Sequence, residues 1–372
     1  MANDVPKLWS NTSTIKVRVM DKETYEKQRA FAGDKQPSML RRCVGHDYTE
    51  RRMYMITMVT EGRQPLFGTV LGKCDAEPGD SDFPHIELTE LGQRVSSHWH
   101  AIHERYPQIE IIALQMMPDH FHGILFVKEK LEKPLGKVLL GFKQGCNKAF
   151  KDLMPEVASV AVLQQHTRLA PKAKTQDRKH GLLFVAGYND KILFRQGQLE
   201  TWLKYLRDNP RRLLMKRQRP DLFRVCFGLK IGNQTYSAIG NQFLLTHPIR
   251  LQVQCSRRLT EAEIAERVSK ALSDAERGAV HVSPAISPGE KAVMRALLNA
   301  HHPLIFLEEN GLTPYTKPGG EFFEACSRGE LLILAPWEHH NERNLISRKQ
   351  CLTLNELAMD ICNISNINTY LT

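Results

Sequence analysis

Several common sequence features are missing from this chain of 372 residues, and each absence narrows the possible protein classes. Its 8 cysteines are scattered from Cys43 to Cys362 and form no C-x-x-C pair, which argues against a zinc ribbon or a disulfide framework and favours free thiols in a reducing compartment. No apolar run approaches the length of a membrane span, and the N-terminus has no apolar signal-peptide core. We therefore expect a cytoplasmic protein of the bacterial cytosol with no membrane partner.

Nucleotide-binding signatures and repeats are also missing. The chain contains no G-x-G-x-x-G and no Walker motif, no internal repeat and no low-complexity tract. What it does contain is a globular composition, with 42% hydrophobic and 25% charged residues, at a length that favours two domains over one. Its formal net charge of +10 suggests a polyanionic partner, most often nucleic acid, although many basic proteins have no such partner.

The apolar pattern divides the chain into an N-terminal arm (1–50), a first domain (51–225) and a second domain (245–372). The arm is polar and weakly periodic, with a possible strand at Ile15–Met20. In the first domain we expect strands at 53–60, 67–71, 109–116 and 120–127, and helices at about 89–102, 135–154 and 198–208, with a basic surface loop at 155–181.

Two further expectations concern where elements end. The helix at 198–208 should end at Asn209-Pro210, because proline disfavours a helical residue before it. From Arg250 onward, strands and helices alternate with short connections, which predicts a parallel, doubly wound α/β sheet. The glycine-containing segment from Phe227 to Pro248 would join the two domains and be open to proteolysis.

The most informative segment is Met117–Val127, where two histidines flank one bulky apolar residue. The apolar run predicts a strand, in which side chains two residues apart share a face. His120 and His122 should then point the same way, with Phe121 in the opposite layer. Such a pair could bind one divalent metal ion. The alternative is a pair of structural histidines, but the long apolar strand and the preceding Met-Pro-Asp favour metal binding.

Five motifs, in this order, resemble those of the single-tyrosine HUH transposases of the small insertion-sequence and REP-associated type. The resemblance spans most of residues 50–220. The matching segments are Met53–Thr57 for the opening strand, Pro65–Gly68 for its following turn, Met117–Gly123 for the HUH motif, Tyr188–Leu193 for the start of the tyrosine helix, and Tyr205–Pro210 for the closing Tyr-Ile-x-x-Asn-Pro.

The resemblance implies a ferredoxin-like α+β domain, a homodimer, and cleavage and rejoining of single-stranded DNA with hairpin ends. It implies that Tyr188 is the catalytic nucleophile, which would leave a 5′-phosphotyrosine. His120 and His122 are implied as ligands of Mg²⁺ or Mn²⁺, an ion that would polarise the scissile phosphate. A nucleoid-associated location would follow.

The third metal ligand is where the chain departs from the family. In the family that the chain resembles, a third ligand can come from one helical turn beyond the tyrosine. Four residues beyond Tyr188 is Ile192, which cannot bind a metal ion. Asp190 is the nearest carboxylate and is our candidate, although it could equally cap a helix. Gln196 and Gln198 are the other candidates.

The nucleophile is the second point of departure. Asn189 follows Tyr188 where many relatives have aspartate. Tyr205 is therefore an alternative nucleophile, although an aromatic residue there could simply seat a helix in the core. Loss of activity is a further alternative.

Basic residues offer a way to hold DNA phosphates, or a merely solvated surface. Absence of intervening acids after Asn209-Pro210 favours DNA contact there. The candidates on the predicted helix at 135–154 are Lys143 and Lys148. The candidates after Asn209-Pro210 are Arg211, Arg212, Lys216 and Arg217.

The second domain resembles, more faintly, the Rossmann-like fold of DNA-processing protein A. The segments that carry this are Ser256–Arg258, Ser287–Glu290 and Pro318–Glu321, the last of which suggests phosphate binding at a helix N-terminus or an ordinary tight turn. Auxiliary DNA or nucleotide binding, or dimerisation, is expected of it. Two rival functions follow for the whole chain: a non-catalytic DNA-binding protein that keeps the transposase scaffold, and a nucleotide-sensing protein.

Overall fold

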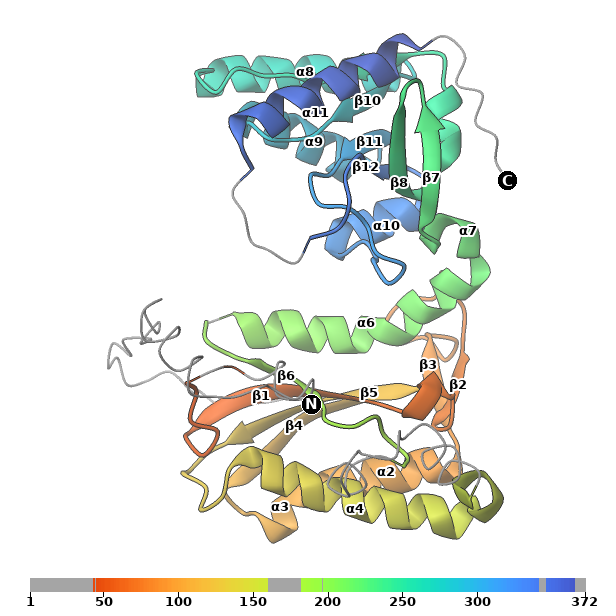
Figure 1. The fold of residues 1–372 in the computed structure, drawn as a ribbon, viewed down its shortest axis with the longest axis vertical. Helices are drawn as coiled ribbons and strands as arrows, with labels where there is room; N and C mark the ends of the chain where they lie inside the picture. The colour runs from red at the N-terminus through yellow and green to blue at the C-terminus, as the bar shows by residue number, and fades with distance from the viewer. Residues whose placement is uncertain (1–42, 44, 160–181, 196, 341–345, 365–372) are drawn as a thin grey trace, which may run out of the picture. The chain divides into compact units, whose positions relative to one another are not determined.

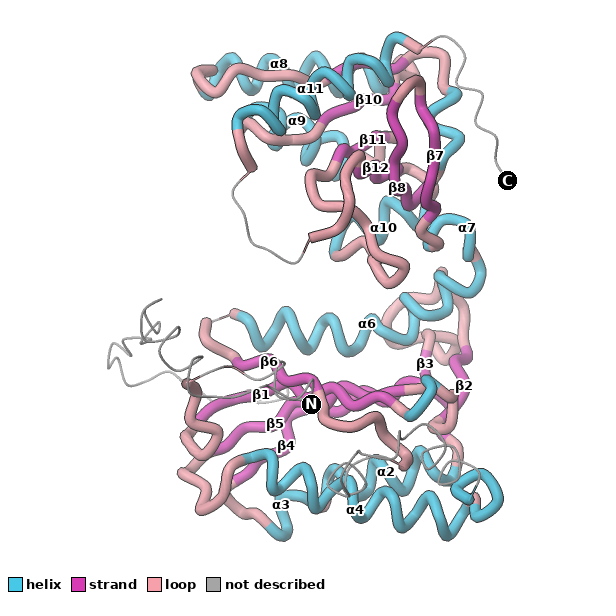
Figure 2. The backbone as a smooth tube through the Cα atoms, in the orientation of Figure 1, coloured by secondary structure: helices cyan, strands magenta, loops and turns pink. Residues whose placement is uncertain are grey.

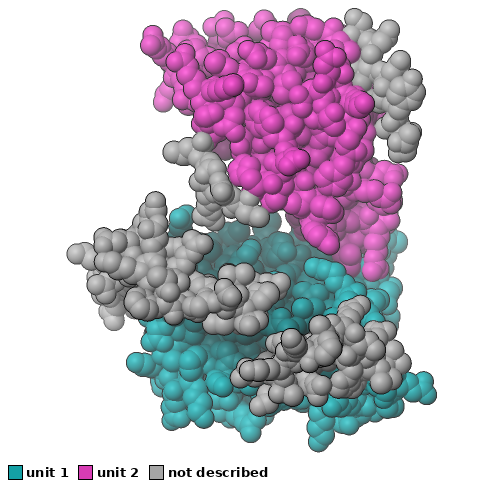
Figure 3. Space-filling view, viewed as in Figure 1, with its two compact units in different colours: residues 1–211 teal, residues 212–372 magenta. Residues whose placement is uncertain are grey.

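The computed structural model describes residues 43, 45–159, 182–195, 197–340 and 346–364 (Figure 1). The predicted strand at Ile15–Met20 and residues 160–181 of the predicted loop lie outside this part. The chain contains both helices and strands along its length and is a mixed α/β protein (Figure 2). Two compact units divide it, residues 1–211 and residues 212–372 (Figure 3).

The first unit is built on a four-stranded sheet. Its strands are β1 (Arg52–Val59), β4 (Ile109–Met117), β5 (His120–Val127) and β6 (Asn189–Ile192), in the order β4-β5-β1-β6. Every neighbouring pair is antiparallel. The long apolar strands β1 and β5 are central, as their nearly continuous burial requires, because both of their faces are covered.

Helices cover both faces of this sheet (Figure 1). On one face, α2 (Glu90–His100) and α4 (Leu135–Leu153) pack against a core that contains Tyr54, Phe121 and Leu125; we call it the α4 face. In the chain, α2 is preceded by a 3-10 turn at Glu61–Arg63 and by a hairpin of β2 (Gly68–Leu71) and β3 (His85–Leu88). The short α3 (Ile102–Arg105) follows α2. On the other face, Trp202 and Leu206 of α6 (Gln198–Gln218) pack against β1 and β5; we call it the α6 face.

Gly123 of β5 faces Trp99 of α2. A Cβ atom added at Gly123 would lie 2.3 Å from the indole of Trp99, which is fully buried. We predict that Gly123→Ala destabilises the protein by about 3 kcal/mol, because it overpacks this contact. Urea unfolding measures the change. The matched control is Gly141→Ala in α4, whose added Cβ meets nothing within 4 Å and which should be neutral or slightly stabilising.

Helix α6 does not end at Asn209-Pro210, as the sequence predicts, but continues to Gln218. Pro210 lacks the N–H that would bond to the carbonyl of Leu206, a loss of about 3 kcal/mol in an ordinary helix. Here both Asn209 and Pro210 are buried, and this packing offsets the loss. The division between the two units falls just after Pro210, at Arg211.

The second unit contains a six-stranded sheet in the order β7-β8-β12-β11-β10-β9. Strands β9 (Arg250–Gln252), β10 (Val280–Ser283), β11 (Leu304–Leu307) and β12 (Leu331–Ala335) are parallel and lie in chain order. Right-handed crossovers then put α8 (Glu261–Glu276), α9 (Pro288–Asn299) and α10 (Gly320–Arg328) on one face, where they form one core. Helix α11 (Arg348–Asn363) packs on the other face.

The segment expected to join the domains is instead part of this sheet. Residues 226–240 form the hairpin of β7 (Cys226–Ile231) and β8 (Gln234–Gly240), and β8 pairs antiparallel with β12. Gly232, with a φ of 58°, provides the left-handed residue in the two-residue turn. A helical turn at Pro220–Phe223 (α7) precedes the hairpin and a 3-10 turn at Gln242–Thr246 follows it. Because β8 of this hairpin is part of the sheet of the second unit, the segment is not the linker that its glycines suggested.

Within the described residues, the helices are too short or too polar to cross a membrane.

Candidate functional site

His120 and His122 share the α6 face of the sheet at the start of β5. Their ring centroids lie 5.0 Å apart, with the rings nearly perpendicular. Phe121, between them, is fully buried in the core of the opposite face. The strand therefore presents two imidazoles side by side, as the alternation of the sequence predicts.

Each imidazole is held through its Nδ1 atom. His120 Nδ1 lies 2.6 Å from Asp119 Oδ1, and His122 Nδ1 lies 2.7 Å from Oγ1 of Thr57, its partner on the neighbouring strand β1. Although burial opposes it, hydrogen bonds and charge from His120 and Arg63 lower the pKa of Asp119 to about 2. This ionised carboxylate can only accept, so His120 Nδ1 donates and Nε2 is the ring nitrogen left for a metal ion.

His122 is neutral at physiological pH. Burial, together with the neighbouring His120 and Lys191, lowers the pKa of His122 to about 3. A neutral imidazole is the form that binds metal ions. When Nδ1 donates to Thr57 Oγ1, His122 also presents its Nε2 lone pair.

Tyr205 is the tyrosine that the structure brings to this pair. Its ring centroid lies 5.6 Å from that of His122, in an edge-to-face arrangement. The flanking Trp202 and Leu206 anchor α6 in the core of the α6 face, whereas Tyr205 is 40% exposed. An aromatic residue that merely seated the helix would be buried, so the exposure of Tyr205 argues against that alternative.

Tyr188 lies on the other face of the sheet. It belongs to the buried core of the α4 face and is 8% exposed. A Cβ added to Gly136 of α4 would lie 3.5 Å from its hydroxyl. The residues that follow Tyr188 form strand β6 rather than the expected helix. Within one chain, the sheet therefore separates Tyr188 from His120 and His122.

Asp190 is also on the α4 face. It pairs with Ile56, a member of that core, and its Oδ2 accepts a hydrogen bond of 2.7 Å from the Tyr48 hydroxyl. It therefore cannot complete a metal site with His120 and His122, because side chains of paired residues point to the same face. Across the described residues, no group of three histidine, cysteine or acidic side chains is placed to hold a metal ion.

The two glutamine candidates for the third ligand do not supply one either. The side-chain oxygen of Gln198 accepts hydrogen bonds from the backbone N–H groups of Phe194 and Arg195 and so caps the start of α6. Gln196 lies outside the described residues.

Lys143 is a structural residue and not a DNA contact. It is 3% exposed, and its Nζ donates to the carbonyl oxygens of Val185 (2.9 Å) and Gly187 (2.5 Å). Helix α4 thereby fixes the segment that leads into β6. The alternation of apolar and polar residues in a helix could not distinguish this buried lysine from an exposed one.

We predict that Lys143→Met lowers the free energy of unfolding by about 1–3 kcal/mol, because two part-buried carbonyl oxygens lose their donor while the packing volume is kept. Urea unfolding measures this loss. Lys148→Met, at an exposed position of the same helix, should change it by less than about 0.5 kcal/mol. Loss of DNA affinity by a fully stable Lys143→Met protein would contradict the structural role.

Two of the four basic candidates of α6, Arg211 and Arg212, have partners within their own units. Arg211 forms an ion pair with Asp208 at 2.8 Å. Arg212 donates to the carbonyl oxygen of Pro318 and lies 3.7 Å from the centroid of the Phe323 ring. Lys216 is half-buried and Arg217 is exposed. Of this set, Arg217 and Lys148 have the exposure that phosphate contact requires.

Motif residues of the second unit have structural roles as well. Glu290 is 2% exposed and accepts hydrogen bonds from the backbone N–H groups of Cys255, Ile286 and Ser287. This carboxylate fills the N-terminus of α9, so no phosphate is needed there. Gly319 is the N-cap of α10, and no side chain caps that helix.

Sequence reasoning missed three residues of the α6 face: Thr57, Asp119 as a partner of His120, and Lys191. Because Asp119 directly precedes His120, its role as a partner could have been recognised from the sequence. Thr57 and Lys191 come from other strands, so their proximity depends on strand register.

Comparisons with known proteins give partial likenesses. No protein-family model matches the chain. A curated protein of Haemophilus influenzae, described as uncharacterized, is 26% identical over 87 residues, which are 23% of this chain and 42% of that protein. The chain thus spans less than half the length of this relative.

Two solved structures resemble parts of the chain. DNA processing protein A from Helicobacter pylori, described for its single-stranded DNA binding mode, is 22% identical with a TM-score of 0.28 and covers 37% of this chain and 60% of that one. A REP-associated tyrosine transposase bound to a REP hairpin is 12% identical with a TM-score of 0.27, over 45% of this chain and 72% of that one. With TM-scores below 0.3, neither likeness identifies a function for this chain.

Proposed function

We propose that the first unit cleaves and rejoins single-stranded DNA, with Tyr205 as the nucleophile. The observation that carries this is the placement of the exposed Tyr205 ring 5.6 Å from His122, on the face that presents both histidines. Tyr205 belongs to the segment that resembles the closing motif of the HUH transposases. The assignment therefore keeps the reaction that the sequence suggests and moves the nucleophile from Tyr188 to Tyr205.

The charge around the site suits a DNA strand. Lys191 is exposed and close enough to His122 to affect its pKa, and Lys204 and Arg207 are exposed on α6 beside Tyr205. Cations in such positions attract phosphates without reading sequence. The protein would then select its substrate by the hairpin ends of the DNA, which the resemblance implies.

His120 and His122 fit a divalent ion that takes its remaining ligands from water and from phosphate oxygens, because both imidazoles have a partner at Nδ1. An ion bound there would polarise the scissile phosphate and neutralise charge on its oxygens. Mn²⁺ or Mg²⁺ is the proposed ion, and the two histidines are its proposed protein ligands.

The reaction follows from the position of the phenol. The Tyr205 oxygen attacks phosphorus and loses its proton to solvent, the bond from phosphorus to the 3′ oxygen breaks, and the departing 3′ oxygen takes up a proton from solvent. The products are a 5′-phosphotyrosine and a free 3′ hydroxyl. Attack by another 3′ hydroxyl reverses these steps and restores the phenol, so the strand is rejoined with no external energy source.

Denaturing electrophoresis tests the proposal. The full chain is incubated with Mn²⁺ and labelled single-stranded oligonucleotides drawn from hairpin-forming DNA that flanks the gene. We expect a band of labelled DNA that resists SDS and is lost when EDTA is present. Binding of these oligonucleotides with no covalent band on any of them would favour the non-catalytic DNA-binding alternative. A homodimer is part of the proposal, and light scattering measures it.

A further inference from the structure

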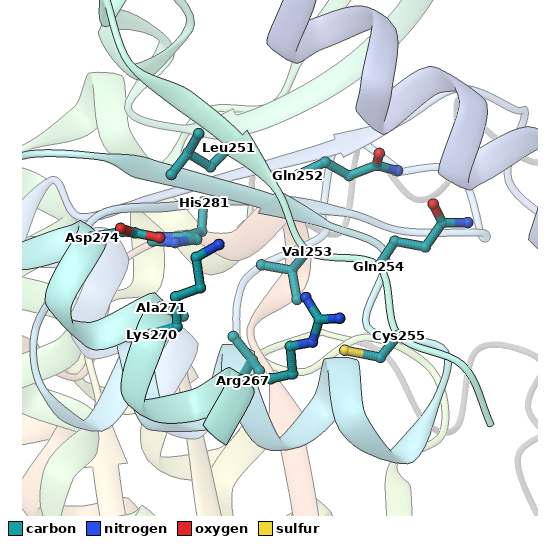
Figure 4. Close-up of a pocket in the computed structure, with 11 residues that line it drawn as sticks. Leu251, Gln252, Val253, Gln254, Cys255, Arg267, Lys270, Ala271, Asp274 and His281 are labelled. Atoms are coloured by element: carbon teal, nitrogen blue, oxygen red, sulfur yellow. The ribbon is translucent and has the colours of Figure 1, made fainter. Parts of the chain in front are cut away.

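A cavity of about 190 Å³ lies in the second unit between β9 and α8, on the face of the sheet that α8 covers (Figure 4). Strand β9 is at the edge of its sheet and pairs with β10 alone. The cavity is far larger than the roughly 10–15 Å³ that one water molecule needs. It is separate from the histidine pair, which belongs to the first unit.

Two cations line this cavity. Arg267 and Lys270 lie three residues apart on α8, so their side chains share one side of the helix. Figure 4 shows both side chains extending from α8 toward β9. Neither forms an ion pair with a residue in the described ranges, although Asp274 lies one turn beyond Lys270. Glu263 also lies one turn before Arg267, at the outer end of the same helix. Two cations that line one cavity without a direct ion pair favour an anionic occupant.

A buried histidine also lines the cavity. His281 is 2% exposed, and its Nδ1 has no hydrogen-bond partner among the described residues. Burial lowers the pKa of His281, and the opposing charge of Asp274 does not overcome it, so the ring is neutral. Buried nitrogens in native proteins nearly always have a partner. A polar occupant of the cavity, with its water, would provide one.

We propose that the cavity between β9 and α8 binds a phosphate group, held by Arg267 and Lys270. The phosphate belongs to a free metabolite or to a DNA backbone, and both sources offer the same oxygens. Arg267 is suited to two of these oxygens because its guanidinium donates along parallel directions. Gln254, exposed two residues beyond β9, provides an amide at the rim.

Isothermal titration of the full chain with inorganic phosphate at constant ionic strength tests the proposal. Wild type should show a saturable site. The double variant Arg267→Gln, Lys270→Gln should bind at least about tenfold more weakly, because each cation contributes charge-assisted hydrogen bonds. The matched control Lys291→Gln, Arg295→Gln removes two exposed cations from the neighbouring α9 and should bind like wild type.

A gain of affinity provides a second readout. Asp274→Asn removes the acid that lines the cavity and should tighten phosphate binding, whereas it would weaken the binding of a cation or a zwitterion. The proposal is overturned if wild type shows no saturable site, or if both double variants lose affinity equally. Titration with an unphosphorylated single-stranded oligonucleotide then separates the sources: a loss confined to the Arg267, Lys270 double variant assigns the phosphate to the DNA backbone, and equal binding by both assigns it to a free metabolite.

Discussion

Tyr205→Phe should reduce cleavage of single-stranded hairpin DNA by at least about a thousandfold, which is typical for removal of a catalytic nucleophile. The change deletes one oxygen from a ring that is 40% exposed, so folding and DNA binding should persist. Cleavage rates are measured on labelled oligonucleotides with Mn²⁺, and DNA affinity is measured in parallel by fluorescence anisotropy. Loss of cleavage with unchanged affinity assigns a chemical role to the hydroxyl.

Tyr188→Phe is the matched control, since it makes the same chemical change on the other face of the sheet. Tyr188 is buried in the core of the α4 face, so the variant should lose some stability and still cleave DNA at a rate close to that of wild type. If Tyr188→Phe abolishes cleavage by folded protein while Tyr205→Phe does not, the assignment of Tyr205 is wrong.

His120→Ala and His122→Ala should each weaken Mn²⁺ binding by about a hundredfold or more and reduce cleavage to the level seen with EDTA. Each variant removes one of only two protein ligands that we propose. Loss of a group that merely orients a ligand already costs about 10–100-fold. Thr57→Val, which removes the partner of His122 Nδ1, should weaken Mn²⁺ binding by about 10–100-fold. Electron paramagnetic resonance of free Mn²⁺ measures the affinity.

His100→Ala is the control for these variants, because His100 is an exposed histidine on α2. It should bind Mn²⁺ like wild type. Unchanged Mn²⁺ affinity after removal of His120 or His122 would mean that the pair is structural, as the alternative reading of the sequence holds.

The histidine pair was predictable because its geometry depends on neighbours in sequence. A strand places residues two apart on one face, and the apolar residues of β5 identify the strand. The partner of His120, Asp119, is equally local. Thr57 is not, since its contact with His122 requires the register between β1 and β5.

The tyrosine was harder to predict because its position depends on how distant elements pack. Tyr188 and Tyr205 are both aromatic residues near apolar segments. The sequence does not show that residues 189–192 extend the sheet while α6 crosses its opposite face. The same limit applies to Lys143, whose burial depends on carbonyls more than 40 residues away in the chain. In the second unit, the alternation of strands and helices was readable, whereas the hairpin of β7 and β8 was hidden by its glycines.

The site of covalent attachment tests the central claim most directly. Protein trapped on a labelled hairpin oligonucleotide is digested with trypsin, and mass spectrometry identifies the peptide that carries the nucleotide. Lysines and arginines in the chain put the two tyrosines in different peptides, Tyr205 in 205–207 and Tyr188 in 180–191. We predict a 5′-phosphotyrosine at Tyr205. Attachment at Tyr188 would contradict the account.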